Sequence, residues 1–137
     1  QKGVSTLGYV IYENRTRLKP EFRGKDIVSL LKSGLNKNDI NESYRANLFA
    51  YCLDAYNIPD ADQLTGCKDV IMDCTFVNEE DRDDTTHFTL DEAIKVCKDA
   101  GVKKMYAAHL SGRYDYNEVV KNYPDITFIN PYKVNNL

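Results

Sequence analysis

Three apolar stretches that read as strands each end in a residue capable of chemistry, and this constrains the fold more than any other feature. The stretch FAYCLD ends in Asp54, DVIMD ends in Asp73, and MYAAH ends in His109. The other histidine of the chain, His87, lies just before a predicted helix. Strands alternating with helices predict an α/β arrangement, in which reactive side chains gather where strands end. We therefore expect a site within residues 69–114, which contain Asp73, His87 and His109.

The predicted elements follow the order β-α-β-β-α-β-α-β. Strands are expected over residues 4–13, 47–53, 69–74, 103–108 and 125–129, and helices over 24–33, over 90–100 and after Asp115. The helix over 90–100 has the clearest signature, because Thr89 with Glu92 forms a capping box and Gly101 ends it.

Length and composition are those of one globular domain, with 137 residues of which 42% are hydrophobic. The four cysteines lack Cys-x-x-Cys spacing and fall mostly in apolar runs, which predicts reduced, partly buried thiols and a cytoplasmic setting. No apolar stretch approaches the roughly 20 residues needed to span a bilayer, so membrane association is not expected. The chain opens at Gln1 without methionine, and we expect it to continue a longer protein.

Charge is uneven along the chain, with nine Lys/Arg against five Asp/Glu in residues 1–45 and nine against sixteen in the rest. A basic segment over residues 15–25 contains Arg15, Arg17, Lys19, Arg23 and Lys25, with Glu21 as its only acid. Such a segment can hold phosphates. A solvated hairpin with ordinary surface charges explains the pattern equally well.

For each candidate site residue, the sequence also allows an ordinary structural role. Asp54 can accept backbone hydrogen bonds in the turn after its strand, or it can bind a metal through its hard carboxylate oxygens. His109 can be a metal ligand or a surface histidine at a strand end. His87 precedes a helix cap, where it can act as a general acid or phosphate donor or be a plain loop histidine.

The same holds for two supporting residues. Asp73 can orient His87 by accepting its ring N–H, or it can be an ordinary strand-end turn residue. Arg113 can bind a phosphate bidentately or pair with the acidic loop 79–84. That acidic loop is interpreted as solvated, because it lacks the glycine and the alternation of a calcium-binding loop.

Several segments, in order along nearly the whole chain, resemble the C-terminal half of ribonuclease Z, a tRNA 3′-end endonuclease of the metallo-β-lactamase fold. These segments are STLGYVIYE, RTRLKPEFRGKDIVSLLKSG, FAYCLDAYN, MDCTF, THFT, HLSGRY and PDITFINPYKV. MDCTF is similar to the family's His-Glu-Ala-Thr segment, THFT to its His-Ser-Thr segment, and HLSGRY to its His-Phe-Ser-x-Arg-Tyr segment. The resemblance implies the C-terminal half of an αββα sandwich.

The resemblance also implies roles for individual residues. Asp54 would bridge two zinc ions, His109 would ligate one of them, and His87 would protonate the leaving oxygen while Asp73 holds its tautomer. Arg113 would bind phosphate. The reaction would be metal-assisted hydrolysis of a phosphodiester.

The chain departs from the family pattern in ways that bear on activity. It contains nothing like the family's His-x-His-x-Asp-His sequence, and with two histidines it cannot assemble a full dinuclear site alone. We expect the missing ligands in an N-terminal half, on a longer chain or a companion chain. Met72 replaces the first histidine of His-Glu-Ala-Thr, Asp73 is one methylene shorter than glutamate, and Leu53 stands where the family usually has glycine.

The substrate is left open. Residues 14–46 would form a short basic arm, inserted in a single domain over residues 1–137, in which Arg15, Arg17 and Lys19 grip precursor tRNA through its phosphates. Alternatively, the chain resembles phage-encoded relatives that hydrolyse cyclic mononucleotides. A third hypothesis is a non-catalytic half that binds nucleic acid or completes another subunit. The resemblance further implies a homodimer.

Overall fold

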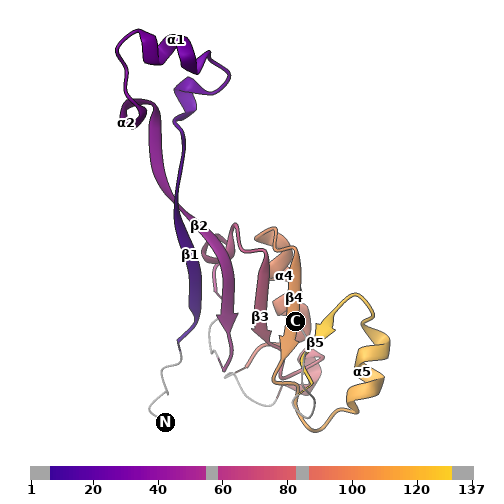
Figure 1. The fold of residues 1–137 in the computed structure, drawn as a ribbon. Coiled ribbons are helices and arrows are strands. Elements are labelled where there is room, and N and C mark those ends of the chain that lie inside the picture. The colour runs from indigo at the N-terminus through magenta and orange to yellow at the C-terminus, as the bar shows by residue number, and fades with distance from the viewer. Residues whose placement is uncertain (1–6, 55–58, 83–86, 131–137) are drawn as a thin grey trace. The chain divides into compact units, whose positions relative to one another are not determined.

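The computed structural model describes residues 7–54, 59–82 and 87–130. The chain divides into two compact units: a main unit of residues 1–11 and 47–137, and an inserted unit of residues 12–46 (Figure 1). Strands β1 and β2 contribute residues to both units. The predicted domain organisation, one domain with an insertion over 14–46, stays a prediction.

The elements follow one another in an alternating α/β order. They are β1 (Tyr9–Leu18), η1 (Pro20–Phe22), α1 (Ile27–Lys32), α2 (Lys37–Ile40), β2 (Asn41–Cys52), α3 (Ala61–Leu64), β3 (Asp69–Asp73), η2 (Glu79–Asp81), α4 (Leu90–Asp99), β4 (Lys104–Ala108), α5 (Tyr116–Asn122) and β5 (Thr127–Phe128). None of the described helices is long and apolar enough to cross a membrane.

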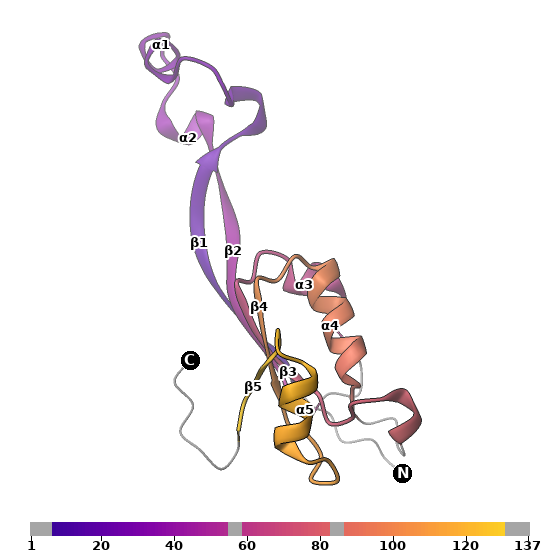
Figure 2. The same cartoon turned by 90° about the vertical axis from the view of Figure 1, so that its right-hand side faces the viewer.

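The five strands form one sheet in the order β1-β2-β3-β4-β5. β2 pairs with β3, β3 with β4, and β4 with β5, all in parallel. Because strand order follows chain order without reversal, right-handed crossovers place the connecting helices on the same face of the sheet. Figure 2 shows α3 and α4 on one side of β3 and β4. The parallel arrangement also brings the C-terminal ends of β2, β3 and β4 to one edge.

The core of the main unit lies between the sheet and its helices. α4 begins as the sequence predicts, because the Thr89 hydroxyl accepts from the Glu92 N–H and the Glu92 carboxylate accepts from the Thr89 N–H. Leu90, Ala93 and Cys97 form its buried side. They belong to the core cluster that also contains the sheet residues Ala50, Val70, Met72 and Ala107.

All four cysteines are free, as predicted, and they are more deeply buried than the partly buried thiols that the sequence indicated. Burial raises the pKa of the Cys52 thiol to about 11 and that of Cys97 to about 12. Burial, together with the nearby Asp73 charge, raises the pKa of Cys74 well above its usual value. At physiological pH these thiols are therefore neutral, and they pack in the core as small apolar side chains.

Most predicted elements are confirmed, with differences at their bounds. The strands expected over 69–74 and 103–108 are β3 and β4, and the helix expected after Asp115 is α5, whose first N–H groups are capped by that carboxylate. The strand expected over 125–129 shortens to Thr127–Phe128, and the helix expected over 24–33 to Ile27–Lys32. Of the strand expected over 4–13, residues 4–6 lie outside the described residues.

β1 and β2 extend well beyond their predicted ranges, to Leu18 and back to Asn41. Here the prediction was too short, because residues 13–18 and 41–46 are largely polar and show no apolar alternation. The two strands are neighbours in the sheet. Backbone pairing therefore forms a strand where the side-chain pattern alone gives no signal.

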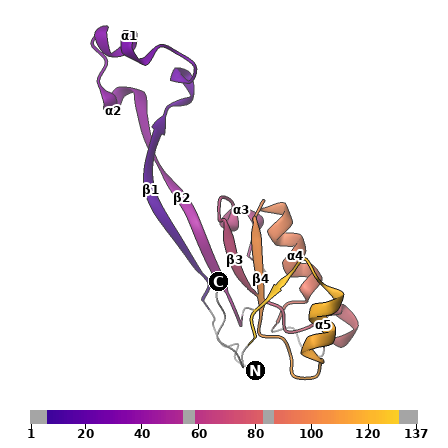
Figure 3. The ribbon, with the colours of Figure 1, turned by 45° about the vertical axis from the view of Figure 1, so that its right-hand side comes forward.

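The inserted unit is held by local caps and one buried apolar residue. Asp26 caps α1 by accepting from the Val28 N–H, and Asn36 caps α2 within a capping box. The Lys19 N–H donates to the Ile40 carbonyl at 2.9 Å, and the Ile40 side chain is buried. Figure 3 shows α1 and α2 in the segment that joins β1 to β2. α1 buries none of its residues, so this unit depends little on a core.

Candidate metal centre

Four residues from separate elements converge at the C-terminal edge of the parallel strands. Asp54 follows β2, Asp73 ends β3, His109 follows β4, and His87 lies just before α4. Each offers one possible ligand atom, and these atoms all lie within 4.8 Å of one another. The structure thus brings together the four residues that the sequence placed at strand and helix ends.

Two of these residues have unusual backbone conformations. Asp54 has a φ of 50° and His109 a φ of 63°, in the left-handed region that residues other than glycine rarely adopt. Asp54 follows β2 and His109 follows β4, the two strands on either side of β3. Strain of this kind persists when the surroundings hold it, and it is concentrated at functional sites.

Asp73 is the buried centre of the cluster, with no part of its side chain exposed. Its Oδ1 accepts from the backbone N–H of Thr75 at 2.9 Å and contacts the Thr75 hydroxyl at 2.7 Å. Its Oδ2 lies 2.7 Å from Nδ1 of His87. Hydrogen bonds to both oxygens compensate the cost of burying a carboxylate.

His87 is held on two sides. Its Nδ1 meets Asp73, and its ring lies edge-on to Phe76 with the centroids 6.5 Å apart. Backbone bonds on either side of Phe88 fix this segment, because the Phe76 N–H donates to the Phe88 carbonyl and the Leu90 N–H donates to the Phe76 carbonyl. With Nδ1 committed to Asp73, Nε2 is the ring nitrogen left for chemistry.

His109 contacts a different partner with each ring nitrogen. Nδ1 lies 2.8 Å from the Thr75 hydroxyl, and Nε2 lies 3.2 Å from Oδ1 of Asp54. Its ring lies 5.0 Å from the ring of His87, centroid to centroid. When Nδ1 carries the proton, a lone pair on Nε2 faces a carboxylate oxygen. Two electron-pair donors that converge without a proton between them can both bind one metal ion, so these residues fit a metal site.

Arg113 contacts the acidic loop. Its Nη1 donates to the backbone carbonyl of Asp81 at 2.8 Å, and its guanidinium lies 5.2 Å from the Phe76 ring centroid. The neighbouring Tyr114 donates its hydroxyl proton to the Asp81 carboxylate and accepts from the Val77 N–H. Burial is the main cause that raises the pKa of this tyrosine. The segment after His109 is thus tied to the loop that precedes His87.

The three basic residues predicted to bind phosphate lie in the inserted unit and have partners there. Arg15 forms an ion pair with Glu13. Arg17 forms one with Glu42 and also lies over the Tyr44 ring. The Lys19 ammonium donates to the backbone carbonyl of Asp39. Their phosphate-binding role stays a prediction.

Thr75 connects Asp73 to His109 but was not among the predicted site residues. A signal was available: Asp73 and Thr75 have the Asp-x-Thr spacing of an Asx turn, in which the carboxylate accepts from the N–H two residues later. The link to His109 spans 34 positions along the chain. It depends on β3 and β4 being neighbours, which the spacing of residues cannot reveal.

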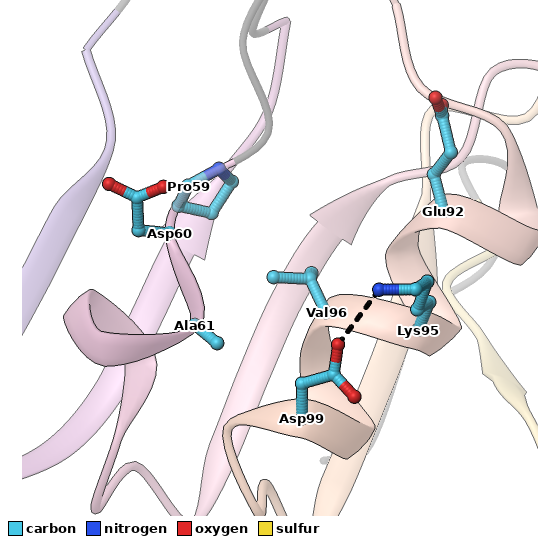
Figure 4. Close-up of a pocket in the computed structure, with 7 residues that line it drawn as sticks. All are labelled: Pro59, Asp60, Ala61, Glu92, Lys95, Val96 and Asp99. Atoms are coloured by element: carbon cyan, nitrogen blue, oxygen red, sulfur yellow. Dashed lines mark hydrogen bonds and ion pairs between the residues drawn. The ribbon is translucent and has the colours of Figure 1, made fainter.

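A surface hollow of about 270 Å³ lies apart from this cluster (Figure 4). It is lined by Pro59, Asp60, Ala61, Glu92, Lys95, Val96 and Asp99. Lys95 pairs with Asp99 across one turn of α4, and Glu92 belongs to the capping box of that helix. Lys95, Asp99 and Glu92 therefore have structural partners, and none of the residues that line the hollow belongs to the metal cluster.

The fold of this chain is similar to that of a solved structure. The chain is similar to the protein described as "Crystal Structure of a New Diphosphatase from the PhnP Family", with a TM-score of 0.51 and 23% identity, over 66% of this chain and 35% of that one. The predicted fold class, α/β and part of a metallo-β-lactamase-type sandwich, is confirmed. No family model matches the chain.

Sequence comparison then gives a particular resemblance. The chain is 27% identical over 125 positions to Ribonuclease Z of Streptomyces avermitilis and 41% identical over 49 positions to Ribonuclease Z of Pyrococcus horikoshii. The first alignment covers 81% of this chain and 42% of the relative, so the chain spans less than half of that protein's length. The second covers 36% of this chain and 16% of the relative. The predicted resemblance to part of a ribonuclease Z-like protein is confirmed.

Proposed function

We propose that this chain is the C-terminal part of a zinc-dependent phosphodiesterase of the ribonuclease Z type, which cuts precursor tRNA at its 3′ end. The observation that carries the proposal is the convergence of Asp54, Asp73, His87 and His109 within 4.8 Å at one edge of the sheet. Similarity to Ribonuclease Z over 81% of the chain supports it. Free, reduced cysteines agree with a cytoplasmic location.

The metal ligands on this chain would be Asp54, bridging two zinc ions, and His109, binding one of them through Nε2. The bound cations would supply positive charge for the phosphate and lower the pKa of the attacking water. Asp54 and His109 are each about half exposed, with side-chain exposures of 57% and 46%. They are thus accessible both to the ions and to a substrate.

His87 would donate the proton that the leaving oxygen needs. Asp73 holds Nδ1 of this ring at 2.7 Å, which keeps Nε2 directed to the reaction and stabilises the imidazolium that must form before donation. The His87 side chain is 21% exposed, so it is accessible while Asp73 is completely buried. A buried carboxylate behind a partly exposed imidazole is a common acid–base arrangement.

The remaining ligands would come from an N-terminal half that packs on the face of the sheet opposite the helices. The paired residues Tyr51, Ile71 and Tyr106 form a row on that face, because they alternate with residues that face the helices. Tyr51 is 39% exposed and Ile71 is half-buried, whereas Tyr106 is buried. An apolar row left partly uncovered is suited to a second layer. We further propose that the complete protein is a homodimer.

For the substrate, precursor tRNA is the first choice, because the inserted unit contains a high density of basic side chains near aromatic rings. Arg17 lies over Tyr44, and Arg45 lies 3.8 Å from the Tyr12 ring centroid. One observation favours the alternative substrate, a cyclic mononucleotide. Arg15 and Arg17 are neutralised by Glu13 and Glu42, which leaves less positive charge for a long RNA backbone.

The two substrates are separated by neutralising Arg15, Arg17 and Lys19 to glutamine and measuring binding of precursor tRNA by the purified chain at several salt concentrations. If they contact RNA phosphates, affinity falls, and the slope of log affinity against log salt decreases by about 1 for each lost contact. The matched control neutralises three exposed lysines of the main unit, Lys98, Lys103 and Lys121.

Equal effects of the two triple variants would contradict an RNA-gripping role for the inserted unit. Adding the N-terminal half and assaying a cyclic mononucleotide in parallel tests the alternative. Hydrolysis of the small substrate should be unchanged by neutralising Arg15, Arg17 and Lys19. Loss of both activities in that variant, with an unchanged unfolding transition, would contradict both readings of the substrate.

A further inference from the structure

We propose that Thr75 is a positioning residue, which relays the buried Asp73 carboxylate to His109 and thereby fixes the proton of that histidine on Nδ1. The three groups form one chain of contacts: Oδ1 of Asp73 to the Thr75 hydroxyl at 2.7 Å, and the same hydroxyl to Nδ1 of His109 at 2.8 Å. This inference adds a positioning residue to the proposed function. It rests on the proposed function only in the part that concerns the metal.

The direction of the hydrogen bonds follows from the chemistry of the groups. A hydroxyl has one proton to donate, and a carboxylate can only accept. The Thr75 proton therefore goes to Asp73, and the Thr75 oxygen accepts from Nδ1–H of His109. Nε2 is left with a lone pair at the edge that faces Asp54, which is what a metal ligand requires.

Asp54 competes for the same proton, because a proton on Nε2 would give its carboxylate a partner at 3.2 Å. Burial decides this competition. The Asp54 side chain is 57% exposed and is hydrated without the histidine, whereas Asp73 has no exposed surface and depends on its protein partners. With the proton on Nε2, the Thr75 hydroxyl would donate to Nδ1, and Oδ1 of Asp73 would keep only the backbone N–H of Thr75. Losing one hydrogen bond at a buried carboxylate is more costly than losing a surface ion pair. The Nδ1–H form of His109 is therefore favoured.

The backbone holds the relay in register. The Cys74 N–H donates to the Ala108 carbonyl at 2.9 Å, and the Ser111 N–H donates to the Thr75 carbonyl at 3.0 Å. These bonds flank Thr75 on one segment and His109 on the other. Asp73 is thereby connected to both histidines of the chain: to His87 directly at 2.7 Å, and to His109 through Thr75. One buried carboxylate thus sets the tautomers of both rings.

The test uses ¹⁵N-labelled histidine in the metal-free chain, at a pH where both rings are neutral. The chain has two histidines, so four ring nitrogens give a simple spectrum, which a His87→Gln variant assigns. We expect Nδ1–H for both rings in the unmodified chain. Nε2–H at His109 would overturn the proposal without any variant, and so without any question of misfolding.

Variants then isolate the hydroxyl. Thr75→Val should shift His109 toward Nε2–H and leave His87 as Nδ1–H, whereas Thr75→Ser, which keeps the hydroxyl, should preserve both tautomers. An unchanged His109 ring in Thr75→Val would overturn the relay. Asp54→Asn removes the competing carboxylate and should leave His109 as Nδ1–H.

A second readout concerns the metal. Zinc affinity, measured by competition with a chelator, should fall about 10–100-fold in Thr75→Val, as for other partners of metal-bound histidines, and be restored in Thr75→Ser. Equal affinities in both variants would overturn the metal-presenting part of the proposal. If the chain combined with its N-terminal half binds no zinc and cleaves no phosphodiester, the proposed function fails, while the tautomer measurement on the metal-free chain still decides the relay.

Discussion

The main unit and the inserted unit place charged residues in opposite ways. In the main unit, Asp73 is completely buried and contacts Thr75 and His87 through both carboxylate oxygens. In the inserted unit, Arg15 and Arg17 are about half exposed and pair with carboxylates at the surface. The first arrangement fixes atoms for chemistry, and the second presents charge that a ligand can take over. Mutations in buried polar networks and in exposed ion pairs therefore change stability by different amounts.

The comparison is tested most strongly by truncating one apolar side chain in each unit. Leu90 is completely buried in α4, and Leu90→Ala should lower the free energy of unfolding by about 2–5 kcal/mol. Val28 in α1 is 60% exposed, and Val28→Ala should change it by less than about 0.5 kcal/mol. Urea unfolding measures both. Similar losses would show that the inserted unit has a core of its own.

The next largest difference between the units is expected when one carboxylate charge is removed from each. Asp73→Asn replaces an acceptor of His87 by a donor and should cost about 1–3 kcal/mol, because a buried hydrogen bond is lost. Glu42→Gln breaks the surface pair with Arg17 and should cost about 0–1 kcal/mol. The same unfolding experiment compares them. An equal cost would mean that Asp73 is less essential to its network than its burial indicates.

One capping box from each unit gives a smaller and more closely matched contrast. Thr89 caps α4 in the main unit, and Asn36 caps α2 in the inserted unit. Each substitution to alanine should cost about 0.5–2 kcal/mol. Thr89→Ala should lie at the upper end because Thr89 is only 2% exposed. A larger loss for Asn36→Ala, by thermal unfolding, would reverse the expected order.

Alkaline pH should affect the main unit alone, because Cys52, Cys67, Cys74 and Cys97 all belong to it. Burial raises the pKa of Cys52 from 9.0 to about 11 and of Cys97 to about 12. The unfolded chain therefore releases thiol protons first, and this stabilisation is complete below pH 9 and lost as pH rises toward 12. Unfolding at about pH 8 and about pH 10.5 measures it. A Cys52→Ala, Cys97→Ala variant should show a weaker dependence; an identical one would contradict the assignment.

The sequence predicts the fold well where side-chain pattern and packing agree. Thr89 and Glu92 identify the start of α4 because both capping bonds are local. The ends of β3 and β4 are likewise close to prediction, because short apolar runs stop at Asp73 and Ala108. The strand over residues 41–46 was not predicted, because it is formed by backbone pairing and has no apolar face.

The sequence predicts which residues form the site, but it does not predict which of them contact one another. Asp54, Asp73, His87 and His109 stand at element ends, which the sequence shows directly. The left-handed backbone at Asp54 and His109 leaves no mark in the sequence, because neither residue is glycine. The Thr75 contact with His109 depends on which strands are neighbours. Long-range register determines such contacts, and local patterns do not contain it.

The central claim, that Asp54 and His109 are metal ligands while His87 is the proton donor, is tested most directly by zinc affinity. The chain is combined with its N-terminal half, stripped of metal and titrated by chelator competition, alongside the same assembly carrying Asp54→Ala, His109→Ala or His87→Ala. Loss of a ligand should weaken binding by more than the roughly 10–100-fold that a supporting partner costs, whereas His87→Ala should keep most of the affinity. Equal affinity in all four proteins, or the greatest loss in His87→Ala, would contradict the account.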